Sequence, residues 1–89
     1  MTTVRVIVRG RVQGVGFRWF VRDAADARGV NGWVRNRRDG GVEAVLSGSD
    51  ADVDAVLTAL RVGPDFAHVA DVDVSEGEDP RLHGFEIRR

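Results

Sequence analysis

The sequence predicts an α+β protein with a ferredoxin-like sandwich, in which two helices cover one face of a mostly antiparallel sheet. Two observations support this prediction. Stretches with the two-residue period of strands and the 3.6-residue period of helices alternate in the order βαββαβ, and a short strand closes the chain. The 89 residues, 43% of them hydrophobic, are enough for one small domain over residues 1–89 with a single core.

The first half of this pattern is a strand followed by a helix. Valines alternate with Arg5 and Ile7 over Val4–Val8, as in a strand with one buried face. The run Phe20–Arg28 has apolar residues at helical spacing, and Gly29 is placed to end this helix as a C-terminal cap.

A hairpin is predicted next. Gly32–Arg37 and Val42–Leu46 both alternate as strands, and Asp39-Gly40 between them is a strong signal for a two-residue turn. Both of these turn residues tolerate a positive φ.

The second helix has clear start and stop signals. Ser49 is a suitable N-cap, aspartates occupy the first turn, and Gly63-Pro64 ends the apolar stripe that runs from Val53 to Leu60. The rest of the chain is predicted as a fourth strand, an acidic loop and a short final strand, over Val69–Val74, Ser75–His83 and Gly84–Arg88.

Composition excludes several classes of site. The chain has no cysteine, so disulfides, thiolate catalysis and zinc–thiolate centres are excluded. Its two histidines, His68 and His83, lack metal-ligand spacing and are expected at the surface. No apolar run is long enough to span a membrane, and the N-terminal residues lack a leader pattern, so we expect a cytoplasmic protein.

Charge is divided unevenly along the chain. The net charge is −1, but residues 1–40 hold nine arginines and three acids, whereas residues 41–89 hold four arginines and eleven acids. The basic half contains the glycine-rich stretch Gly10–Arg18, which suits an anionic ligand. Arginines on solvated faces would give the same pattern.

The glycine-rich stretch lies between the first strand and the first helix. Three glycines within seven residues let the backbone curl and turn several N–H groups inward. Beside a helix N-terminus such amides form an anion site, and Arg18 adds a charged fork that can hold two phosphate oxygens. The alternative is a tight turn that carries a surface arginine.

Topology brings a second polar residue to the same edge. A strand–helix–strand crossover makes the first two strands parallel, so Asn36 and the glycine-rich stretch lie at the same end of the sheet. With the third strand between them, the first two strands are about 10 Å apart. Asn36 lies on the same face of its strand as Val34, toward the helices, so its amide needs a hydrogen-bond partner. Capping the hairpin backbone is the alternative role for this asparagine.

The stretches Gly10–Arg18 and Gly32–Glu43 closely resemble the two signature blocks of the acylphosphatase family, and Gly84–Arg88 is similar to its usual ending. The resemblance implies hydrolysis of small-molecule acyl phosphates to a carboxylate and inorganic phosphate, with no metal or cofactor. It also implies that Asn36 orients the attacking water and that Arg18 holds the phosphoryl group together with the loop. The loop residues concerned are Gln13, Gly14, Val15, Gly16 and Phe17.

Two rival functions use the same fold. A sheet of this topology can bind RNA through exposed aromatics, but Val42–Leu46 contains none, so no nucleic-acid partner is expected. The second rival is a phosphate-binding or regulatory domain without significant turnover, alone or in a larger assembly. We expect a monomer that binds no membrane.

Overall fold

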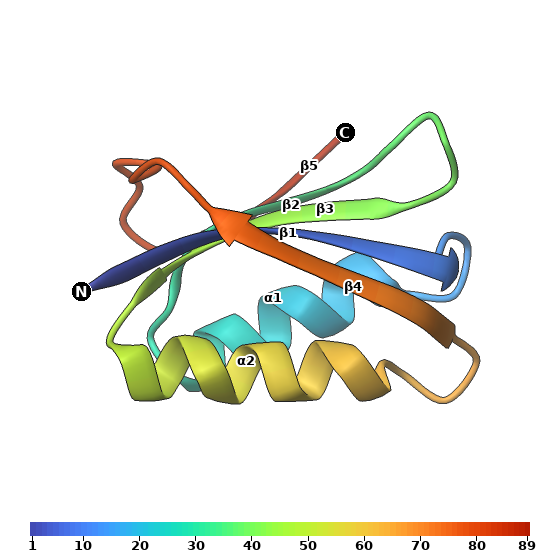
Figure 1. The fold of residues 1–89 in the computed structure, drawn as a ribbon, viewed down its shortest axis with the longest axis horizontal. Coiled ribbons are helices and arrows are strands. Elements are labelled where there is room, and N and C mark those ends of the chain that lie inside the picture. Colours follow the sequence, from blue (N-terminus) through green and yellow to red (C-terminus); the bar gives the residue numbers. More distant parts are fainter.

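Two helices pack against one face of a five-stranded sheet in the computed structural model of the chain, which describes residues 1–89 (Figure 1). The elements, in chain order, are β1 (Thr2–Arg11), α1 (Phe17–Ala27), β2 (Asn31–Asn36), β3 (Val42–Gly48), α2 (Asp50–Val62), β4 (His68–Glu76) and β5 (Phe85–Arg88). The predicted ferredoxin-like order, βαββαβ with a short final strand, is confirmed.

The strand order β4-β1-β3-β2-β5 places β3 between β1 and β2. Because β3 is antiparallel to both neighbours, β1 and β2 run in the same direction, as the crossover predicts. Ala44 of β3 faces Val6 on one side and Val34 on the other. The carboxyl ends of β1 and β2 therefore lie at the same edge of the sheet.

The core lies between the sheet and the helices. Alternate residues of the central strands point into it, which explains the two-residue period of the sequence. The fifteen buried residues of this cluster are Val6, Val8, Val12, Phe17, Val21, Ala25, Val30, Val34, Val42, Ala44, Leu46, Val53, Val56, Leu57 and Leu60.

Both helices end where the sequence predicts. Gly29 follows α1 with a φ of 65°, and the Val30 N–H bonds to the Ala25 carbonyl oxygen at 2.9 Å. The Asp52 N–H donates to Ser49 Oγ at 3.2 Å to cap α2, and Gly63 with a φ of 74° closes it. No helix of the chain is long and apolar enough to cross a membrane.

Gly10 belongs to β1 and not to the loop before α1, which corrects the prediction that all three glycines curl together. β1 runs on to Arg11, and a register shift against β4 falls between Arg9 and Gly10. Gly10 has a φ of 127°, and a Cβ here would lie 2.8 Å from the Ala70 nitrogen. This glycine therefore serves the close approach of β1 and β4.

The β2–β3 connection is longer than the predicted two-residue turn. Arg37 N–H bonds to the Gly41 carbonyl oxygen at 2.8 Å, so three residues, Arg38 to Gly40, form the loop. The Asp39 carboxylate accepts from the Gly41 N–H at 3.0 Å and from Arg37 Nε. The hydrogen bond from Gly41 and the adjacent Arg37 guanidinium lower the pKa of Asp39. Asp39 thus fixes the turn.

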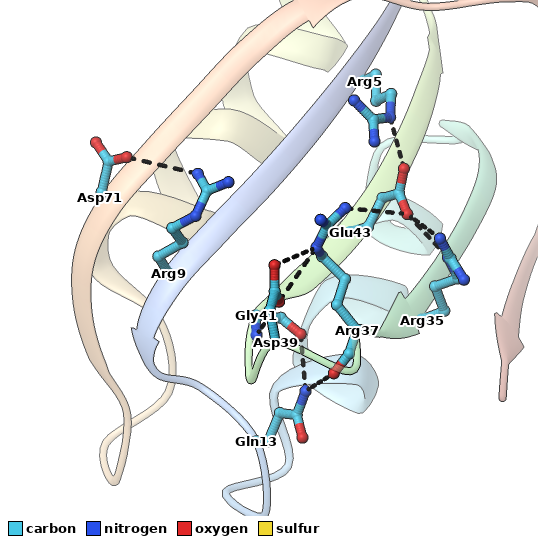
Figure 2. Close-up of polar contacts among 9 residues, drawn as sticks. All are labelled: Arg5, Arg9, Gln13, Arg35, Arg37, Asp39, Gly41, Glu43 and Asp71. Atoms are coloured by element: carbon cyan, nitrogen blue, oxygen red, sulfur yellow. Dashed lines mark hydrogen bonds and ion pairs between the residues drawn. The ribbon is translucent and has the colours of Figure 1, made fainter.

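The face of the sheet away from the helices carries a covered carboxylate. Glu43 points to this face and is only 4% exposed, because Arg5, Arg35 and Arg37 converge on it (Figure 2). Burial alone would raise the pKa of Glu43, but hydrogen bonds from Arg35 and Arg5 outweigh burial and hold it below its ordinary value.

Candidate active site

A cavity of about 170 Å³ lies where β1, α1 and β2 meet, at the edge predicted from the topology. It brings Arg18 and Asn36 together, although they are far apart in the sequence and come from different elements. The lining residues are Val12, Gly14, Gly16, Phe17, Arg18, Trp19 and Asn36. A water needs roughly 10–15 Å³ of such space, so a phosphoryl group with a water beside it fits.

The backbone before α1 is shaped by two glycines in the left-handed region. Gly14 has a φ of 73°, and Gly16, the N-cap of α1, has a φ of 76° and no side chain to cap the helix. The first backbone hydrogen bond of α1 runs from the Phe20 N–H to the Gly16 carbonyl oxygen. The six N–H groups from Gly14 to Trp19 have no acceptor within the chain.

These six amides sit at the positive end of the α1 dipole. Unpaired N–H groups at a helix N-terminus bind anions, above all when the loop before the helix is tightly curved. Here the curvature comes from Gly14 and Gly16, and both line the cavity. Backbone donors without an acceptor thus lie beside Arg18, and their binding of an anion stays a prediction.

Arg18 is the only charged residue that lines the cavity. It is partly buried in the first turn of α1, and its Nη1 donates to the Arg88 carbonyl oxygen of β5 at 3.3 Å. A guanidinium has five N–H donors, so the contact with Arg88 orients the group and leaves donors for an anion. Neither a carboxylate nor a histidine lines the cavity to compete for them.

Asn36 ends β2 with its side chain in the cavity, on the same parity as the fully buried Val34. Its amide makes no hydrogen bond within the chain, and in particular none to the hairpin that follows it. Asp39 and Gln13 bond to the hairpin backbone instead. The Asn36 amide is therefore available to a ligand or a water in the cavity.

Gln13 joins the loop to the hairpin. Its Nε2 donates to the carbonyl oxygens of Arg37 at 2.7 Å and Gly41 at 2.9 Å (Figure 2). Gln13 and Val15 do not line the cavity, and Val15 packs against the core. A direct contact of these two residues with phosphate stays a prediction, whereas the side chain of Gln13 has a structural partner.

Trp19 lines the cavity as well, although no motif in the sequence predicts it there. One signal could have revealed it: helical spacing places Trp19 off the face of α1 that buries Phe17 and Val21, so a large aromatic is left at the surface. His68 and His83 are exposed, as predicted, and no group of three or more histidines or acids is arranged to hold a metal ion.

Comparison with known proteins agrees with this site. A family model described as acylphosphatase matches residues 4–87. An acylphosphatase from Haloarcula marismortui is 52% identical over 88 residues, which cover 98% of this chain and 96% of the relative.

Solved structures give the same result for the fold. The crystal structure of acylphosphatase from Bacillus subtilis superimposes with a TM-score of 0.95 at 42% identity, and all of both chains is covered. The chain is also similar to full-length HypF in a phosphate- and nucleotide-bound form, with a TM-score of 0.87 at 26% identity. That match covers 98% of this chain and 12% of the larger protein.

Proposed function

The chain belongs to the acylphosphatase family, and we propose that it hydrolyses the carboxyl–phosphate bond of small-molecule acyl phosphates to a carboxylate and inorganic phosphate. One observation carries the proposal. One small cavity is lined by Arg18, by Asn36 and by four other residues of the stretch from Gly14 to Trp19, whose backbone N–H groups have no acceptor within the chain. We further propose that residues 1–89 act as one domain, because both helices share one core with the sheet.

The cradle binds the phosphoryl group. Amides of the loop and Arg18 surround its non-bridging oxygens, where negative charge is concentrated in the transition state of phosphoryl transfer. These donors are fixed by the backbone of Gly14 and Gly16 and by the contact of Arg18 with β5. They need little reorganisation when the reaction begins.

Asn36 positions the attacking water. Its side-chain carbonyl oxygen accepts a hydrogen bond from that water and directs a lone pair at phosphorus. The leaving group is a carboxylate of low basicity, so the reaction needs no strong general acid, and no acidic side chain lines the cavity. We propose that the water's proton passes to an oxygen of the phosphoryl group itself.

Charge stabilisation comes from Arg18 and the amides, so we propose that the reaction proceeds without a metal ion. Nucleic acid is not a proposed partner, because β3 contributes no aromatic to the outer face of the sheet and Arg5 and Arg35 on that face are paired with Glu43. We propose that the active form is a monomer, since Arg18 and Asn36 of the same chain meet in the cavity.

The test separates hydrolysis from binding alone. The purified chain is assayed with acetyl phosphate after exhaustive chelation, and its melting temperature is measured against inorganic phosphate. Phosphate release with an undiminished rate supports the metal-free hydrolase. A phosphate-dependent rise in melting temperature without turnover favours the alternative, a binding domain. A rate that chelation abolishes and magnesium restores contradicts the mechanism.

A further inference from the structure

Trp19 lines the cavity and is also exposed to solvent. Three apolar residues line the cavity, but Val12 and Phe17 are each 1% exposed and belong to the core. Trp19 is 55% exposed, although large aromatic side chains are usually buried. A large apolar surface is thus presented to solvent at the rim of the phosphate cradle.

The size of the cavity makes this rim important. Pockets that enclose a drug-sized ligand measure about 300–1,000 Å³, whereas this one measures about 170 Å³. It takes the phosphoryl group and the water, so the acyl group of a substrate must lie outside it. Trp19 is the one exposed apolar side chain among the residues that line the cavity.

The indole is held in place although it is not buried. The Arg22 guanidinium lies over the ring, 4.3 Å from its centroid. Arg22 comes from the next turn of α1. Its Nε is buried and makes no hydrogen bond, so stacking on the indole is the interaction that this part of the guanidinium makes. A ring fixed on one side loses little freedom when a ligand covers the rest of its surface.

We propose that Trp19 is the acyl-binding residue of this site and that it gives the chain a preference for acyl phosphates with an aromatic acyl group over acetyl phosphate. The inference rests on the proposed function. A planar aromatic acyl group packs on the indole with favourable stacking geometry and removes apolar surface from water. A methyl group does little of either, so acetyl phosphate gains much less from Trp19.

The test compares benzoyl phosphate with acetyl phosphate. In the Trp19→Ala protein, the ratio of the two kcat/KM values, benzoyl over acetyl, is expected to fall by about tenfold, in line with the loss of one stacking contact and its buried area. Phe66→Ala is the matched control, because Phe66 is 81% exposed but does not line the cavity, and it leaves the ratio unchanged. A ratio that changes less than twofold in Trp19→Ala overturns the inference.

A binding measurement keeps this test independent of turnover. The chain has two tryptophans, and Trp33 lies outside the cavity, where the Arg35 and Arg88 guanidinium groups contact its ring. Benzoylphosphonate, which cannot be hydrolysed, should change the emission of a Trp33→Phe protein and leave that of a Trp19→Phe protein unchanged. The reverse result overturns the inference. If the unmutated chain hydrolyses neither substrate, the proposed function fails, while the fluorescence still decides whether Trp19 contacts the acyl group.

Discussion

Gln13 donates a hydrogen bond of 2.7 Å from its side-chain amide to the carbonyl oxygen of Arg37, the residue directly after Asn36. A second bond from the same nitrogen reaches Gly41 on the other side of the hairpin turn. The loop that carries the cradle and the strand that carries Asn36 are therefore fixed to each other through one side chain. In the proposed mechanism, this connection sets the distance between the bound phosphate and the water at Asn36.

Replacing Gln13 by methionine should separate positioning from binding. The thioether side chain is similar in length and adds no charge beside the anion site, but it leaves two carbonyl oxygens without their donor, so the unfolding free energy should fall by about 1–3 kcal/mol. In the folded protein kcat should fall about tenfold, whereas the dissociation constant of phosphate should change much less. Urea unfolding, steady-state kinetics and phosphate titration give the three values. An equal loss of phosphate affinity would show that Gln13 contacts the anion directly.

Asn36→Ala should lower kcat and leave binding intact. Asn36 is assigned to the water, which the bound ground state does not need, so kcat should fall by at least about 10²-fold while phosphate affinity stays nearly constant. Stability should also be nearly unchanged, because the amide has no bond to the hairpin in this structure. A stability loss of about 1 kcal/mol with normal kcat would instead assign Asn36 to hairpin capping.

The meeting of Arg18 and Asn36 could be predicted from the sequence because it follows from chain direction and parity. A crossover makes β1 and β2 parallel, and Asn36 shares the helix-facing parity of Val34. Helix ends were predictable as well, since the cap residues Ser49 and Gly29 act on their own neighbouring backbone. Such local or periodic signals are present in the order of residues.

The remaining features depend on side-chain contacts that follow no periodic pattern in the sequence. Alternation places Glu43 on the outer face, but its burial follows from the register that sets Arg35 opposite it and from Arg5 and Arg37 reaching across. The contact of Gln13 with the hairpin spans 24 positions and is made by a loop side chain. An alternating pattern does not show how far a side chain reaches in the folded protein or which geometry the turn adopts.

Arg18→Ala should weaken binding and turnover together. In the proposed mechanism Arg18 contacts the anion before and during transfer, so the phosphate-induced rise in melting temperature should largely disappear while kcat and kcat/KM both fall. Lysine should restore little, because one ammonium cannot reproduce a two-pronged contact with phosphate oxygens. Thermal melts over a phosphate series, with kinetics on Arg18→Ala and Arg18→Lys, measure both effects. Full rescue by lysine would contradict a bidentate role.

Glu43 should make part of the stability dependent on pH. Its pKa is lowered in the folded state, so its contribution is complete above its ordinary value of about 4.3 and is lost as the pH falls through the lower folded pKa. At pH 7 Glu43→Gln should cost about 2 kcal/mol, because charged hydrogen bonds to half-exposed arginines are lost. The difference from the unmutated protein should shrink toward pH 3 in urea unfolding.

Glu86→Gln is the control for Glu43, since Glu86 pairs with Arg88 at the exposed surface and should contribute at most about 1 kcal/mol. If Glu43→Gln is no more destabilising than this control at pH 7, the three arginines do not stabilise the sheet through Glu43.

Gly10→Ala and Gly14→Ala should differ in what they damage, although both glycines have a positive φ. At Gly10 an added Cβ would meet the backbone of β4 as well as an unfavourable φ, so the loss of stability should be about 2–4 kcal/mol. At Gly14 a Cβ meets nothing within 4 Å, so the cost should be the strain alone, about 1–2 kcal/mol.

Gly14 lines the cavity and Gly10 does not, so phosphate affinity should fall in Gly14→Ala and be retained in folded Gly10→Ala. Urea unfolding measures the loss of stability in each variant, and phosphate titration measures its affinity for phosphate. Loss of phosphate affinity in folded Gly10→Ala would show that Gly10 belongs to the anion-binding loop, as the sequence pattern predicts.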